Sequence, residues 1–133
     1  MDARNNLGNA LNELGKYEEA VFSYHKAIEL DPEYTEIYSN LSNTLNQLGR
    51  YDEAINNLSK VIEFDPDYAE AYNNLGNTLN GLERYEDAIK NYNKAIQLKP
   101  DFPEAYSNIG NAFYNLKQIQ NALVGIKKSI TLN

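Results

Sequence analysis

Prolines recur at one fixed interval and divide the chain into units. Pro32, Pro66 and Pro100 are each separated by 34 residues. Alanines keep the same interval along the whole sequence, at Ala20, Ala54, Ala88 and Ala122. A fixed period of this length is typical of repeat proteins, in which each unit stacks on the next. The sequence therefore predicts a single domain of four repeats, with the boundaries 1–34, 35–68, 69–102 and a shortened 103–133.

Each unit has the pattern of two helices. In the second unit an apolar stripe with helical spacing runs through Tyr38, Leu41, Leu45 and Leu48. A second stripe follows Gly49 and consists of Ala54, Ile55, Leu58, Val61 and Ile62. The glycine suits the left-handed residue that ends a helix, and a proline ends the second helix of each of the first three units. We expect an all-α fold, namely a right-handed α-α superhelical solenoid of antiparallel helix pairs.

Neither helix of a unit can bury its stripe alone. We expect small residues such as Gly8 and Gly110 to let paired helices approach closely. Tyrosines at the start of the later units should pack onto the second helix of the preceding unit; these are Tyr38, Tyr72 and Tyr106. Glu83 and Lys117 replace the turn glycine. Either Glu83 and Lys117 adopt the left-handed conformation at a cost of about 1 kcal/mol each, or Gly81 or a slightly different turn takes the role of the turn glycine.

The motif Leu7-Gly8-Asn9-Ala10-Leu11 is followed by further spaced residues, namely Tyr17, Ala20, Tyr24, Ala27 and Pro32. This pattern resembles the tetratricopeptide repeat, and the resemblance covers essentially the whole chain in four copies. The resemblance implies a protein–protein interaction scaffold without catalytic activity. It also implies a final capping helix, which we do not expect in this chain.

Composition excludes several classes of function. The chain has no cysteine and one histidine, so the usual metal and thiolate sites cannot form, and we expect no cofactor, no metal and no enzymatic activity. The net charge is −7, and all of the excess lies in residues 1–66, which would repel nucleic acid. No signal peptide or membrane-spanning segment is visible, which favours a cytoplasmic protein without membrane insertion.

The resemblance implies that the first helix of each unit lines a concave groove that binds an extended peptide or a partner helix. The groove positions are Asn6, Asn9, Asn40, Asn43, Asn46, Asn74, Asn77, Asn80, Asn108, Asn111 and Tyr114, with an acidic rim of Glu36, Glu70 and Glu104. Asparagine is a poor helix former, but its amide matches the peptide group. The ladder is similar to that of O-GlcNAc transferase. An alternative is that some of these amides bond neighbouring helices.

The best-known binding mode of the family is a clamp for the carboxylate tail of a heat-shock chaperone. Asn9 and Asn40 match the clamp, but Asn5, Glu70 and Asn74 stand where its three cations belong. Without cations the charge-assisted bonds are lost. We therefore expect a neutral or basic protein or peptide as the partner, and no clamp for chaperone tails.

Two other functions remain open from the sequence. Apolar residues near the end of the chain could stack on the acidic start of a second copy, giving a head-to-tail self-associating structural module. The residues of this end-to-end contact are Leu123, Ile126, Ile130 and Leu132. The chain could also be the targeting fragment of a larger enzyme.

Overall fold

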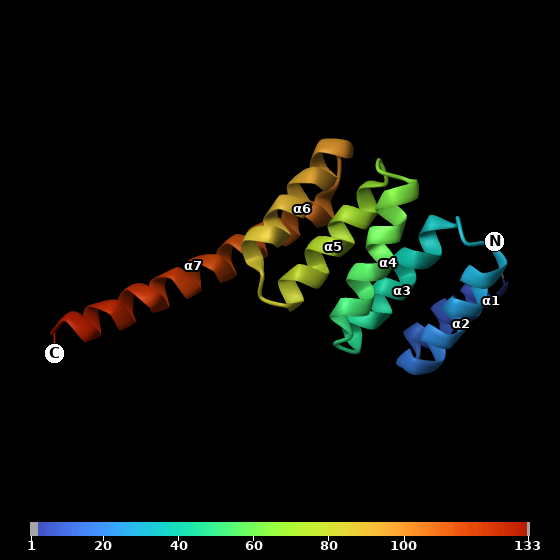
Figure 1. Ribbon diagram of the computed structural model, residues 1–133, viewed down its shortest axis with the longest axis horizontal. Helices are drawn as coiled ribbons and strands as arrows, with labels where there is room; N and C mark the ends of the chain where they lie inside the picture. Colours follow the sequence, from blue (N-terminus) through green and yellow to red (C-terminus); the bar gives the residue numbers. More distant parts are fainter. Residues whose placement is uncertain (1–2, 133) are drawn as a thin grey trace.

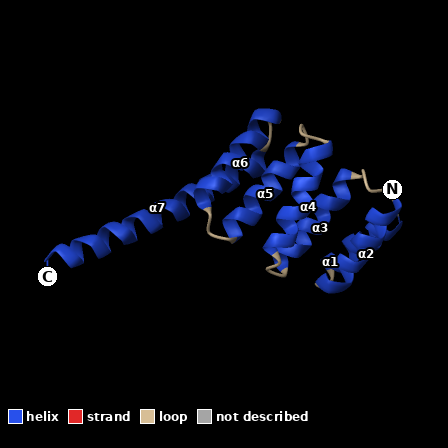
Figure 2. Cartoon of the chain, in the orientation of Figure 1, coloured by secondary structure: helices blue, strands red, loops and turns tan. Residues whose placement is uncertain are grey.

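The computed structural model describes the backbone of residues 3–132 and the side chains of residues 3–128. This part of the chain folds into seven helices and contains no strand (Figures 1 and 2). The helices are α1 (Ala3–Glu13), α2 (Tyr17–Leu30), α3 (Thr35–Gln47), α4 (Tyr51–Phe64), α5 (Ala69–Gly81), α6 (Tyr85–Leu98) and α7 (Pro103–Leu132). The predicted all-α repeat solenoid is confirmed.

The helices form two layers. Each helix contacts the next one along the chain, so that α1 pairs with α2, α3 with α4, and α5 with α6 (Figure 1). The first helices of the units also contact one another, from α1 to α3, from α3 to α5 and from α5 to α7. Among the described residues α2, α4 and α6 make no such backbone approach. The array therefore curves with the first helices on its inner side.

Small residues allow the helices of a pair to pack closely. Ala20, Ala54 and Ala88 are fully buried. The ring of Tyr24 lies directly on Gly8, where an added Cβ would come within 2.5 Å of the ring. Tyr92 lies on Gly76 in the same way. Because neither glycine leaves room for a methyl group, these contacts confirm the expected close approach in the first and third units.

Three turns between paired helices use a left-handed residue. Gly15 and Gly49 have φ values of 77° and 72°. Glu83 occupies the same position in the third unit with a φ of 61°. Gly81 does not replace it, since Gly81 is the last residue of α5. Of the two alternatives for this position, the left-handed glutamate is the one observed.

The fourth unit differs from the expectation of two helices. α7 is one continuous helix that passes through Lys117 without a turn and projects away from the array (Figure 1). The first three units have a left-handed residue, a basic residue, a tyrosine and two acids at the turn, whereas this unit reads Lys-Gln-Ile-Gln-Asn over 117–121. No glycine favours a left-handed residue and no acids favour a new helix start. Ala122 is therefore exposed, unlike its three equivalents.

The tyrosines near the start of the second and fourth units also differ in how far they are covered. Tyr38 is buried in a cluster with Ile28 of the preceding unit, and it also packs on Leu58 and Val61 of its own second helix. Tyr106 is 55% exposed, so it is covered much less than Tyr38. The reason is that the fourth unit has no second helix folded back to cover it.

The residues assigned to an end-to-end contact lie on the projecting half of α7. Leu123 and Ile126 are exposed there. The side chains of Ile130 and Leu132 lie outside the described residues. The head-to-tail contact stays a prediction.

Candidate functional site: an asparagine-lined inner surface

Two neighbouring hollows lie on the inner side of the array. The first has a volume of about 210 Å³ and is bounded by α1 and α3, and it contains Asn9, Asn40, Asn43 and Glu36 of the predicted set. The second has a volume of about 540 Å³ and is bounded by α3 and α5, and it contains Asn43, Asn46 and Asn77. Asn43 belongs to both, so the hollows form one continuous surface, which we call the inner groove.

Buried tyrosines hold two of the groove amides in place. The Tyr24 hydroxyl donates to Asn9 Oδ1 at 2.6 Å, and the Tyr92 hydroxyl donates to Asn77 Oδ1 at 2.7 Å. Burial raises the pKa of each tyrosine to about 12, because removing the phenolate from water is costly. Both hydroxyls are therefore protonated donors. The amide oxygen is occupied, while the amide nitrogen is the group that can meet a ligand.

Threonines hold a second row of amides. Thr44 donates to Asn12 Oδ1 at 2.7 Å, and Thr78 donates to Asn46 Oδ1 at 2.9 Å. Asn80 is the next member of this row, and Ala112 stands where the threonine would be. Asn80 Oδ1 is accordingly buried without a hydrogen-bond partner among the described residues. This threonine–asparagine hydrogen bond therefore joins the first unit to the second and the second to the third. It is missing between the described residues of the third and fourth units.

A third set of amides bonds neighbouring first helices to each other. Asn40 donates to Asn5 Oδ1 at 3.3 Å, and Asn108 donates to Asn73 Oδ1 at 3.1 Å. Asn5 and Asn73 are buried. The alternative that some asparagines bond between helices therefore holds for this set, and the same amides cannot all serve a ligand with both of their polar groups.

The remaining predicted positions do not line the two hollows. Asn74 is buried, and its backbone carbonyl oxygen lies 3.1 Å from the Thr78 hydroxyl, whose proton is shared between this oxygen and Asn46 Oδ1. Lys99 pairs with Glu70 at 3.1 Å, which reduces the negative charge at that point of the rim. The other positions outside the hollows are Asn6, Asn80, Asn108, Asn111, Tyr114 and Glu104.

Sequence reasoning missed several residues that line the groove. Glu13 and Tyr24 belong to the first hollow, and Gln47 and Tyr51 belong to the second. The tyrosines come from the second helices, whereas the groove was expected to be lined by the first helices. The ring of Tyr51 lies against Gly81, within 2.7 Å of where a Cβ would be. A glycine at the end of a first helix, where the other units have a larger residue, is the signal that could have indicated this contact.

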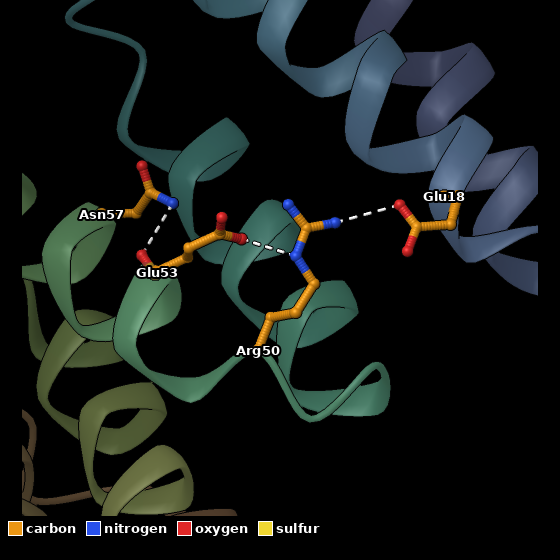
Figure 3. A network of polar contacts seen from close by, with 4 residues as sticks. All are labelled: Glu18, Arg50, Glu53 and Asn57. Atoms are coloured by element: carbon orange, nitrogen blue, oxygen red, sulfur yellow. Dashed lines mark hydrogen bonds and ion pairs between the residues drawn. The ribbon is translucent and has the colours of Figure 1, made fainter.

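The starts of α2 and α4 are joined by an ion-pair network. Arg50 pairs with Glu18 of the first unit at 3.0 Å and with Glu53 of its own unit at 2.6 Å (Figure 3). Asn57 donates to the carbonyl oxygen of Glu53. The hydrogen bond from Arg50 lowers the pKa of the Glu53 carboxyl below its ordinary value. Exposed pairs of this kind contribute little stability, so the network mainly aligns two adjacent turns.

No described helix combines the length and the hydrophobicity that crossing a bilayer requires. The described residues contain no group of three or more histidine, cysteine, aspartate or glutamate side chains that could hold a metal ion.

Comparison with known proteins agrees with the fold. Profiles described as TPR repeat match residues 42–82 and 79–117, and profiles described as tetratricopeptide repeat match residues 2–34 and 23–56. No curated protein sequence matches the chain.

Solved structures of similar shape include two TPR domains and the MamA protein. The first TPR of Spaghetti (RPAP3), bound to the HSP90 peptide SRMEEVD, is 24% identical and covers 86% of this chain and 90% of its own, with a TM-score of 0.77. MamA is 29% identical, with 96% and 70% coverage and a TM-score of 0.73. The Sgt2 TPR domain from Aspergillus fumigatus is 19% identical, with 89% and 80% coverage and a TM-score of 0.82.

Proposed function

Because the chain belongs to the tetratricopeptide repeat family, we propose that it is a protein-interaction module whose inner groove binds an extended peptide of a partner protein. The observation that carries the proposal is a set of groove asparagines whose side-chain oxygen atoms accept hydrogen bonds from the protein itself. Asn9 and Asn77 accept from buried tyrosines, and Asn46 accepts from a buried threonine. Each amide is thereby oriented before a ligand arrives, which lowers the entropic cost of binding.

The orientation of these amides favours main-chain recognition. An asparagine nitrogen carries two N–H donors, and a peptide carbonyl oxygen is an acceptor. Amides that follow one another from α1 to α5 can donate to successive carbonyl groups of an extended chain with little regard to its side chains. Asn43 lies between the two hollows and is exposed, so its whole amide can meet a ligand.

Charge favours a neutral or basic peptide. Glu13 and Glu36 are exposed around the first hollow. The positions that would need cations for a carboxylate clamp hold a buried Asn5, a buried Asn74 and a Glu70 that is paired with Lys99. An acidic chaperone tail would find no charge-assisted donor at those three positions. We therefore expect this groove to differ in specificity from the RPAP3 domain that binds SRMEEVD.

The test compares one groove asparagine with one outside the groove. Twelve-residue peptides are selected from a random displayed library on the immobilised protein, and their affinities are then measured by calorimetry. Asn43→Ala should weaken the selected peptides by about 1–3 kcal/mol if two hydrogen bonds are lost. Asn93→Ala replaces an exposed asparagine of α6 and should leave the affinity unchanged.

Both variants should keep wild-type thermal stability, because alanine is the better helix former. Equal affinity of the wild-type protein and Asn43→Ala for every selected peptide would refute the groove assignment. The peptide SRMEEVD serves as a second probe, and micromolar binding of it would show that the exclusion of chaperone tails is wrong. The targeting of a larger enzyme stays a prediction.

A further inference from the structure

The apolar residues of α7 form one straight seam along the whole helix. Their positions alternate between spacings of three and four residues, through Ala105, Ile109, Ala112, Leu116, Ile119, Leu123 and Ile126. This is the heptad spacing of helices that pair along their length. Such a seam is buried only when another helix packs along it, so we expect a helical partner along both halves of α7.

Only the first half of this seam has a partner in the chain. Ala105 and Ala112 are fully buried, and Leu116 packs against the cluster that α5 and α6 form with the start of α7. Beyond α6 the seam is open: Ile119 is 40% exposed, Leu123 is 60% exposed and Ile126 is 58% exposed. The open half is the part of α7 that extends past the array in Figure 1.

The boundary between the two halves has a defined charge. A hollow of about 290 Å³ lies there, bounded by Leu116, Ile119 and the residues 83–87 at the start of α6. Glu86 and Asp87 lie in the first turn of α6, whose positive dipole end they complement. At the other end of the open seam α7 carries Lys127 and Lys128. The same hollow contains Arg84, which pairs with Asp87 at 2.8 Å, so three acids stand against one arginine there. The seam thus runs from an acidic boundary to a basic end.

We propose that the open half of α7 pairs in antiparallel orientation with the same half of a second copy of this chain. Residues 117–132 form a helix about 24 Å long at 1.5 Å per residue. Two such segments cover each other completely when residue 117 of one copy lies level with residue 132 of the other. Leu123 then contacts Ile126 of the second copy close to the two-fold axis, and the contact is isologous and closed.

The antiparallel arrangement continues the packing that α6 begins. α6 runs in the opposite direction to α7, and its acidic start lies at the boundary hollow. The helix of the second copy would lie in line with α6, with its basic end facing these acids. The acids complement the positive end of α6, and Lys127 and Lys128 of the second copy would approach them with opposite charge. A parallel pair would instead place the two α6 helices at the same level, where they would compete for one seam.

The first experiment measures the mass of the full chain in solution by sedimentation equilibrium over a range of concentrations. We expect a reversible monomer–dimer equilibrium that stops at the dimer. Leu123→Glu combined with Ile126→Glu should raise the dissociation constant more than about tenfold, since it removes the central apolar contacts. Val124→Glu is the matched control: this residue is equally exposed, at 53%, but lies off the seam, and the dimer should persist.

The second experiment determines orientation, and the absence of cysteine makes site-specific labelling simple. A spin label on Ser107→Cys should give a distance of about 50 Å along the helix axis in the antiparallel dimer. A parallel pair would place the two labels side by side.

Three outcomes would overturn the proposal: a monomer at all concentrations, a short distance between the labels, and assembly that grows beyond a dimer. If assembly grows beyond a dimer and Phe22→Glu abolishes this growth, the open seam binds the first unit of another copy instead. Its binding site would then be the apolar hollow where Leu7 and Phe22 are exposed.

Discussion

A single tyrosine links the core of a repeat to its inner groove. Tyr92 lies on Gly76 with its ring and donates to Asn77 with its hydroxyl. Tyr24 has the same two contacts, with Gly8 and Asn9. The packing of the helix pair and the orientation of the groove amide therefore depend on the same side chain.

These tyrosines predict a dependence of stability on alkaline pH. The pKa of Tyr92 and of Tyr24 is raised from 10 to about 12 in the folded protein. Below pH 10 both states keep the proton, and the contribution is fully present. As the pH rises from 10 to 12, the unfolded chain releases the proton before the folded protein does. The contribution of each tyrosine to the free energy of unfolding therefore falls by up to about 2.5 kcal/mol.

Tyr24→Phe combined with Tyr92→Phe should lower the free energy of unfolding at pH 7 by about 0.5–1.5 kcal/mol for each lost hydrogen bond. The same double variant should lose less stability than the wild-type protein between pH 10 and pH 11.5. Urea unfolding at several pH values measures both effects. Parallel curves for the two proteins would show that these hydroxyls do not control the alkaline transition.

The sequence identified columns of asparagines, of which only some members line the two hollows, and it left their roles open. Asn9 and Asn43 belong to the same column, yet one amide is held by a tyrosine and the other is exposed. The difference depends on a partner 15 residues away on another helix. Helical spacing alone specifies which face a residue occupies, and it cannot specify which oxygen accepts from a distant hydroxyl.

At the scale of single elements, α7 shows what local turn residues decide. The boundaries of α1 to α6 follow from the repeat period, because each turn has its left-handed residue and its following acids. The period continues through Leu116 and Ala122, which led to the prediction of a turn between them. The five residues over 117–121 lack the turn signals, and a helix without a turn signal continues.

Transplanting a turn should convert α7 into a helix pair. Replacing residues 117–121 by the Gly-Arg-Tyr-Asp-Glu of residues 49–53 supplies every missing feature. We expect residues 122–132 to fold back, so that Ile126 reaches Gly110, whose Cβ position is now open. Ile126 has the repeat position of Tyr24 and Tyr92, and both of these lie on glycines.

Small-angle scattering measures the result as a shorter maximum dimension of the monomer, at concentrations at which the wild-type chain is also monomeric. The transplanted variant should no longer dimerise, because its seam would be folded against its own unit. An unchanged maximum dimension would show that the turn sequence does not control the path of α7.

At the scale of the whole molecule, stability should be distributed by contacts between adjacent units. α2 contacts α3, and α4 contacts α5, while helices two units apart do not contact one another. Such an array behaves as a chain of nearest-neighbour interactions. Deleting different parts should therefore have very different effects.

Deleting residues 1–34 exposes Ile37, Leu41 and Leu45, which pack against the first unit. Each buried side chain of this size contributes roughly 1.5–3 kcal/mol, so we expect a loss of several kcal/mol in the free energy of unfolding. Deleting residues 118–133 should leave the thermal midpoint of the monomer nearly unchanged, since residues 118–128 are exposed. Equal losses for the two deletions, measured by urea unfolding, would contradict the nearest-neighbour description.

The curvature of the array has a mechanical consequence. Successive first helices touch, whereas successive second helices stay apart. The molecule therefore resembles a coil spring whose turns touch along the inside and are also joined by the contacts of α2 with α3 and of α4 with α5. Tightening the curve is opposed by steric contact between first helices, whereas opening it moves the second helices into the space between them. We expect such a spring to yield in one direction, lengthening to follow a ligand with a longer repeat and resisting one with a shorter repeat.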